Sequence, residues 1–138
     1  MKEILYIDHI ADLGMQFRSD TLAGLFVLAA ESMFAEIGDS DAINNTETVS
    51  IALREENISD LLVNWLRELL YLHHAKRYLF RSFQIKRIDG HSLEASALGE
   101  TFHPGRHTID TEIKAVTYHG GNISSEGGIW QCTIIFDV

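Results

Sequence analysis

The sequence has 138 residues, of which 46% are hydrophobic, and it carries 20 acidic against 11 basic side chains for a formal net charge of −9. This composition excludes a disordered or membrane-spanning chain, because a core can be buried and no apolar run reaches the roughly 18 residues of a transmembrane helix. The excess negative charge repels phosphate backbones, so general binding of nucleic acid is disfavoured. We expect one soluble, cytoplasmic domain that spans residues 1–138.

The chain opens with a segment that predicts two short strands, followed by a helix. Residues 4–18 favour a pair of strands that meet near Asp12 and Gly14. Apolar residues that recur every three or four positions then predict an amphipathic helix over residues 21–37. Gly38 follows this helix, and we expect it to end the helix in the left-handed conformation.

The rest of the chain predicts a second helix among further strands. Helical spacing of apolar residues places this helix at residues 58–75, with Asn57 or Ser59 as its N-cap. The predicted strands are residues 48–54, 79–88, 92–102, 111–119 and 129–137. Asp89-Gly90 indicates a type I′ hairpin, because both residues tolerate the positive φ of that turn. The expected fold class is α+β, with two helices covering one face of a largely antiparallel or mixed sheet.

Several familiar catalytic patterns are disfavoured. The glycine pairs at 120–121 and 127–128 lie between predicted strands, whereas a phosphate-binding loop joins a strand to a helix. The only cysteine, Cys132, falls in an apolar strand, which indicates a small core residue and not a nucleophile. The seven histidines include no i, i+4 pair on a helix, which disfavours a zinc site.

Bases and aromatic residues alternate in segment 76–87, a pattern that can track single-stranded nucleic acid. A strand with one buried and one solvated face explains this segment better.

The last strand carries a different signal. It stops at Asp137-Val138, which places a side-chain carboxylate beside an α-carboxylate. Neighbouring carboxylates repel each other unless protons or a cation neutralise them. A hard cation with oxygen ligands would do so, and a third carboxylate would complete a plausible set of ligands.

Short segments from one end of the chain to the other match one protein family in order. They are Asp8–Gly14, Asn64–Tyr71, Gly99-Glu100, Arg106-His107, Glu112–His119 and Asp137-Val138. Together they resemble the archease family over essentially the whole length. The resemblance implies a non-enzymatic accessory protein of the RtcB-type RNA ligase. Such a protein assists guanylylation of the ligase, and so its multiple turnover, in tRNA splicing and RNA repair.

The resemblance also implies a metal site and partner contacts. Members of the family bind a divalent cation assigned as calcium, and on this chain the implied ligands are Asp12, the Asp137 carboxylate and the terminal carboxylate of Val138. Manganese or magnesium are alternative cations. The residues in matching segments that are expected to contact the partner or a phosphate are Lys114, His9, Glu100 and His119. Neither strong direct nucleic-acid binding nor a membrane partner is expected.

Two other functions stay open at this point. A metal-dependent hydrolase would use the same carboxylates to activate water, although no general base accompanies them in the sequence. An RNA-binding or chaperone-like module would act through segment 76–87, with the arginines of that segment holding phosphates.

Overall fold

A computed structural model describes residues 1–9, 12–118 and 123–138. The elements follow in chain order: β1 (Lys2–His9), β2 (Asp12–Ser19), α1 (Leu22–Ile37), the short 3-10 helix η1 (Ser40–Ala42), β3 (Glu47–Arg54), α2 (Ile58–Lys76), β4 (Tyr78–Ile88), β5 (Ser92–Thr101), β6 (Ala115–Tyr118), β7 (Ser124–Glu126) and β8 (Ile129–Asp137). No helix among the described residues is long and apolar enough to cross a membrane.

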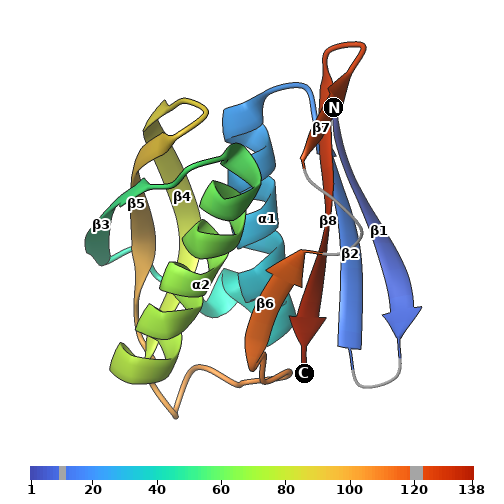
Figure 1. The fold of residues 1–138 in the computed structure, drawn as a ribbon. Coiled ribbons are helices and arrows are strands. Elements are labelled where there is room, and N and C mark those ends of the chain that lie inside the picture. Colours follow the sequence, from blue (N-terminus) through green and yellow to red (C-terminus); the bar gives the residue numbers. More distant parts are fainter. Residues whose placement is uncertain (10–11, 119–122) are drawn as a thin grey trace.

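The strands form two sheets, and the two helices lie between them (Figure 1). One sheet has the order β1-β2-β8-β6, with β7 also paired to β8, and the other has the order β3-β5-β4. Every pairing of the described strands is antiparallel. The predicted α+β class is therefore confirmed, while the expectation of one sheet covered on one face is replaced by a three-layer arrangement.

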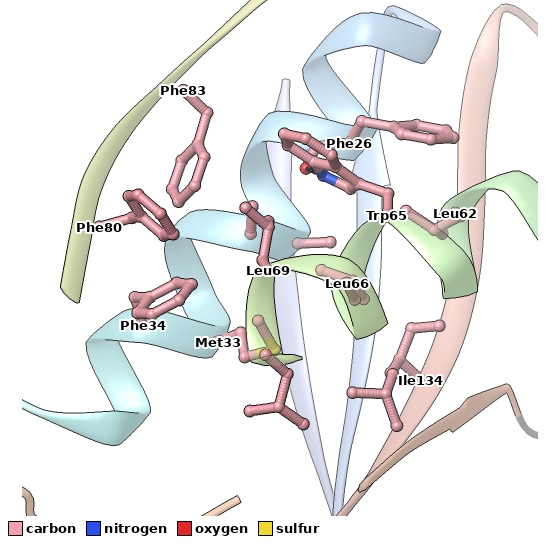
Figure 2. Close-up of a cluster of buried hydrophobic side chains, with 14 of the residues drawn as sticks. Phe26, Met33, Phe34, Leu62, Trp65, Leu66, Leu69, Phe80, Phe83 and Ile134 are labelled. Carbon is pink, nitrogen blue, oxygen red and sulfur yellow. Dashed lines mark hydrogen bonds between the residues drawn. The ribbon is translucent and has the colours of Figure 1, made fainter. Parts of the chain in front are cut away.

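The helices sit between two sheets because their apolar surface is wider than a single stripe. Buried residues of α1 include neighbours in sequence, such as Leu28, Ala29 and Ala30, which cannot all face one sheet. Figure 2 shows the resulting core, in which side chains of both helices meet those of β4 and of β8. The Trp65 indole N–H donates a hydrogen bond to the backbone oxygen of Phe26 at 3.0 Å and so ties α2 to α1.

The ends of the helices depend on specific polar contacts. The hydroxyl of Thr21 accepts a hydrogen bond from the N–H of Gly24, and the Asn57 side chain caps α2 in the same way by accepting from the N–H of Asp60. The prediction for Gly38 was wrong, since its φ of −167° is extended. A Cβ there would lie 2.6 Å from the backbone oxygen of Thr108, so close approach of two segments favours this glycine.

The prediction of a type I′ turn at Asp89-Gly90 was also wrong. The hairpin between β4 and β5 exists, but neither residue has a positive φ. One carboxylate oxygen of Asp89 accepts the N–H groups of His91 and Ser92, both at 2.8 Å, and this side chain shapes the turn. Positive φ values of 60° and 79° occur instead at Gly127 and Gly128, in the tight turn between β7 and β8.

The opening strands are longer than predicted, and one later strand is shorter. β1 and β2 have eight residues each, so Asp12 and Gly14 lie within β2 and not between the two strands. Residues 10–11, which separate the strands in the sequence, lie outside the described residues. Of the strand predicted at 111–119, only β6 is strand among the described residues, and residue 119 lies outside them. Thr111 lies outside β6, where its N–H and that of Asp110 donate to the backbone oxygen of Ile37 at the end of α1.

Candidate functional site

Asp12 and Asp137 lie directly opposite each other on the neighbouring strands β2 and β8. Met15 and Phe17 of β2 and Phe136 of β8 are fully buried and face the helices. Since side chains alternate along a strand, Asp12 and Asp137 lie on the other face of the sheet, away from the core. Directly opposed residues project from the same face, so the register places two carboxylates side by side.

Each of these carboxylates lacks a neutralising partner in the part of the chain that the structure describes. No hydrogen bond or ion pair of the described residues involves either side chain. Like charges directly opposite each other destabilise a sheet pair, and a bound cation removes this repulsion. The two aspartates therefore fit a site for a hard divalent cation, which prefers carboxylate oxygens.

Val138 is the residue that could supply a third oxygen donor to such a site. Within residues 1–9, 12–118 and 123–138, no group of three or more His, Cys, Asp or Glu side chains is arranged to hold a metal ion. Val138 directly follows Asp137, and its side chain packs against the hydrophobic core. This packing holds the last residue of the sequence beside the aspartate pair.

Lys114 is brought to the same place by the backbone. Its N–H donates a hydrogen bond to the backbone oxygen of Asp137 at 2.7 Å, and the next residue, Ala115, is the register partner of Asp137 in β6. The Lys114 side chain is exposed. Of the other predicted contacts, His9 is the register partner of Asp12 in β1, and His119 lies outside the described residues.

Glu100 lies apart from this group, at the end of β5 in the other sheet. Its side chain is 4% exposed and accepts two hydrogen bonds from the guanidinium of Arg106, at 2.6 and 3.1 Å. It also accepts the N–H of Asn44 at 2.6 Å. These donors, Arg106 first, lower the pKa of Glu100 from its usual 4.5 to about 2.

His107 completes this network as a neutral ring. The backbone N–H of His103 donates to His107 Nδ1 at 2.8 Å, so Nδ1 carries a lone pair and no proton. The proton therefore sits on Nε2, which donates to Glu100 at 3.1 Å. Arg106-His107 and Glu100 lie in segments that match the family, but no pattern in the sequence predicts that they pair with each other.

Cys132 and the aromatic residues of segment 76–87 have structural roles, as the sequence predicts. Cys132 is buried, and this burial raises the pKa of its thiol to about 12. In segment 76–87, Phe80 and Phe83 are buried in the core, while the Arg81 and Arg87 side chains face solvent beside acidic partners. Aromatic rings that are buried in this way cannot stack on nucleotide bases.

Comparisons with known proteins identify relatives over nearly the whole chain. The sequence model of the archease protein family matches residues 5–138. The protein archease of Methanopyrus kandleri is 35% identical over 96% of each chain, and that of Methanosarcina mazei is 33% identical over 99% of this chain and 97% of the relative.

Two solved structures share the fold. The solution structure of Methanobacterium thermoautotrophicum protein 1598 superimposes with a TM-score of 0.83 at 31% identity and covers 98% of each chain. A crystal structure from Thermotoga maritima, described as an archease and possible chaperone, has a TM-score of 0.64 at 23% identity and covers 96% of this chain and 94% of the other.

Proposed function

The chain belongs to the archease family, and we propose that it is a non-catalytic activator of an RtcB-type RNA ligase. In this proposal it promotes guanylylation of the ligase, and so its multiple turnover, during tRNA splicing or RNA repair in the cytoplasm. The observation that supports it most directly is the register pairing of Asp12 with Asp137, beside Val138, on the outer face of the larger sheet.

We infer that Asp12, Asp137 and the α-carboxylate of Val138 hold a divalent cation, calcium in the first place and manganese or magnesium as alternatives. When bound, such an ion would present positive charge to phosphate or carboxylate oxygens of the ligase. The chain's own contribution is to hold the oxygens in place. The hydrogen-bonded strands β2 and β8 fix the positions of the two aspartates. Packing of the Val138 side chain against the core fixes the position of the residue that follows Asp137.

Lys114 is proposed to contact a phosphate or a carboxylate of the ligase. Its backbone is fixed by the hydrogen bond to Asp137, and its side chain is exposed. Contacts of the predicted residue Glu100 favour a structural role, because a buried carboxylate with three kinds of donor has little capacity left for a partner. His9 and His119 remain predictions.

The proposed role involves no catalytic turnover by this chain. The Thermotoga maritima protein is described as a possible chaperone, a description that names no reaction. The prediction that the chain is not an enzyme agrees with that description.

A ligation assay tests the proposal. RNA in excess is incubated with an RtcB-type ligase from the same source, GTP and manganese, with and without this protein. We expect product to stop near one turnover per ligase alone and to continue in the presence of the protein. Equal product in both reactions would contradict the proposal. Phosphatase or nuclease activity of the protein alone, lost in Asp12→Asn, would favour the hydrolase instead.

Substitutions locate the activity on the chain. Asp137→Asn keeps the size of the side chain and removes its charge, so we expect a folded protein that no longer stimulates the ligase. Asp41→Asn is the matched control, because the Asp41 side chain is 92% exposed and lies outside the aspartate pair. Loss of folding in Asp137→Asn, measured by thermal unfolding, would instead assign a structural role to that residue.

A further inference from the structure

A groove of about 420 Å³ lies between α2 and β6. Arg67, Tyr71 and His74 line its α2 side, and their spacing of four and three residues places them on one face of the helix. Residues 114–117 form the other side, beginning with Lys114. Arg67 and Tyr71 belong to the segment Asn64–Tyr71, to which the proposed function gives no role.

Two side chains of α2 tie this helix to the opposite wall. Arg67 Nε donates to the backbone oxygen of Val116 at 3.0 Å, and His74 Nε2 bonds the backbone oxygen of Ile113 at 2.8 Å. β6 has β8 as its neighbour on one side and lies at the end of its sheet. The backbone oxygens of Val116 and Ile113 already accept hydrogen bonds from α2, so they are not available to pair with an added β-strand. A partner segment would therefore bind through side chains in the groove.

The groove is basic on a chain that is strongly acidic. Arg67 and Lys114 line it together with His74, and no acidic side chain lines it. The whole sequence, by contrast, has 20 acidic and 11 basic residues. Within the described part of the chain, neither the Lys114 ammonium nor the terminal nitrogens of Arg67 have a hydrogen bond or ion pair. The charge of the groove therefore favours an anionic occupant.

The floor of the groove is apolar. Leu70 and Val116 are 5% and 1% exposed, and the Tyr71 side chain, which is 58% exposed, also lines the groove. Arg67 and His74 are seven residues apart, which is about 10 Å along a helix and matches about three residues of extended chain. An occupant with carboxylates at its ends and an apolar side chain between them complements both features.

We propose that this groove binds an extended acidic segment of a partner protein, with an apolar side chain on Leu70 and Val116 and flanking carboxylates on Arg67 and Lys114. A peptide fits better than an RNA strand, because the apolar surface of Leu70 and Val116 accepts an aliphatic side chain, which RNA lacks. The preference for an acidic peptide is independent of the proposed function, and only the identity of the partner as the RNA ligase rests on it.

The position of the groove links it to the aspartate pair. The N–H of Lys114 bonds the backbone of Asp137, and Ala115 lies opposite Asp137 in the sheet. A segment in the groove would thus place the rest of its protein beside the proposed cation site.

The first test is a titration of the isotope-labelled full chain with a blocked pentapeptide that alternates Glu and Leu, followed by NMR. The same peptide with Gln in place of Glu is the control for charge. We expect shifts of the amide signals at the groove, with affinity for the acidic peptide at least about tenfold higher and falling with added salt. Equal affinity for both peptides, or shifts confined to other surfaces, would overturn the inference.

The second test uses matched double variants. Arg67→Gln with Tyr71→Ser removes charge and ring from the groove while keeping an N–H that can bond Val116. Arg87→Gln with Tyr6→Ser is the control, since both of these side chains are exposed elsewhere. We expect both variants to keep the melting temperature of the unmodified chain. The groove variant should bind the acidic peptide at least about tenfold more weakly, and the control should bind it with the affinity of the unmodified chain.

The ligase itself separates the two proposals. If the unmodified chain binds the acidic peptide but neither binds nor activates the ligase, the proposed function fails and the groove assignment stands. If the chain activates the ligase and the groove variant does so with unchanged affinity for the ligase, the assignment of the ligase as the partner of the groove fails while the proposed function stands. Tighter binding of a short RNA than of the acidic peptide at the same amide signals would overturn the groove assignment.

Discussion

Glu100 keeps its negative charge in the folded protein although its side chain is almost fully buried. Arg106 supplies two of the compensating hydrogen bonds, and Asn44 and His107 supply one each. A buried carboxylate without such donors would be strongly destabilising. The network joins the end of β5 to the loops around residues 44 and 106, so one charged residue fixes the path of two segments.

Replacing this charge should change both the stability and its pH dependence. We expect Glu100→Gln to lower the free energy of unfolding by about 2 kcal/mol at pH 7, since hydrogen bonds to a charged group are lost. The pKa of Glu100 is lowered in the folded state to about 2 from its usual 4.5, so its contribution is present above pH 4.5 and disappears as the pH falls towards 2.

The difference between the unmodified chain and Glu100→Gln should therefore shrink between pH 4.5 and pH 2, as measured by urea unfolding. Glu94→Gln is the control, because its contact with Arg87 at 3.4 Å is exposed and contributes little. A difference that stays constant down to the lower pH would contradict the account.

Cys132 illustrates burial without function at the same scale. The pKa of its thiol is raised to about 12 by burial, so the reactive thiolate is nearly absent at pH 8. We expect a thiol reagent to modify the folded protein on the order of a thousandfold more slowly than the protein in denaturant. A double variant, Cys132→Ala with Ser125→Cys, moves the thiol to the exposed strand β7 and should react fast without denaturant. Fast modification of native Cys132 would mean that β8 opens readily.

At the scale of elements, the β4–β5 pair depends on one very close approach. A Cβ at Gly99 would lie 1.9 Å from the backbone oxygen of Leu79 and 2.8 Å from the Cα of Phe80. Both obstacles are backbone atoms, which cannot move aside as a flexible side chain does. The ladder between these strands shifts register between Phe80 and Ser82, next to this contact.

Gly99→Ala should consequently destabilise the protein by about 2–3 kcal/mol, because the two strands must separate locally. Gly90→Ala is the control, since a Cβ at Gly90 meets nothing within 4 Å, and we expect a change within about 0.5 kcal/mol. Thermal and urea unfolding measure both variants. A neutral Gly99→Ala would show that β4 and β5 are not packed this closely in solution.

Elements with strong local patterns could be predicted from the sequence, whereas their pairing could not. The apolar spacing of α2 and the alternation of β8 gave nearly the observed boundaries. The division into two sheets depends on contacts between distant segments, such as β2 with β8, which no local pattern specifies. For the same reason, the sequence identified Asp137-Val138 as unusual, but only the family resemblance supplied Asp12 as the third residue.

For the whole molecule, charge distribution distinguishes two surfaces that meet at β8 and β6. Residues 1–65 hold 12 acidic and 3 basic side chains, and residues 66–138 hold 8 of each. The register joins Asp12 of the acidic half to Asp137 at the far end of the chain, while the basic groove lies along the adjacent edge. An aspartate pair beside a basic groove is thus a product of the fold and not of either half alone.

If the aspartate pair binds a cation, calcium should stabilise the whole fold. At a free concentration about 100-fold above the dissociation constant, the expected gain is about 2.7 kcal/mol, which raises the melting temperature by several degrees. Asp12→Asn should abolish this gain and leave the metal-free protein at least as stable, because it removes one of two opposed like charges. Asp41→Asn should keep the calcium effect. A calcium effect that persists in Asp12→Asn would assign it to general screening of the net charge.

The terminal carboxylate of Val138 can be tested by the same measurement. A short extension after Val138 converts the α-carboxylate into an amide, which is uncharged and a weaker ligand for calcium, while the side chain of Val138 can still pack on the core. We therefore expect the extended protein to melt at the same temperature without calcium and to lose most of the calcium-dependent increase. An extension of equal length before Met1 is the control. The N-terminus contacts Asp20 at the surface, at the end of the β1–β2 ladder opposite to Asp12. If the C-terminal extension leaves the calcium response intact while Asp12→Asn removes it, the two aspartates hold the cation without Val138.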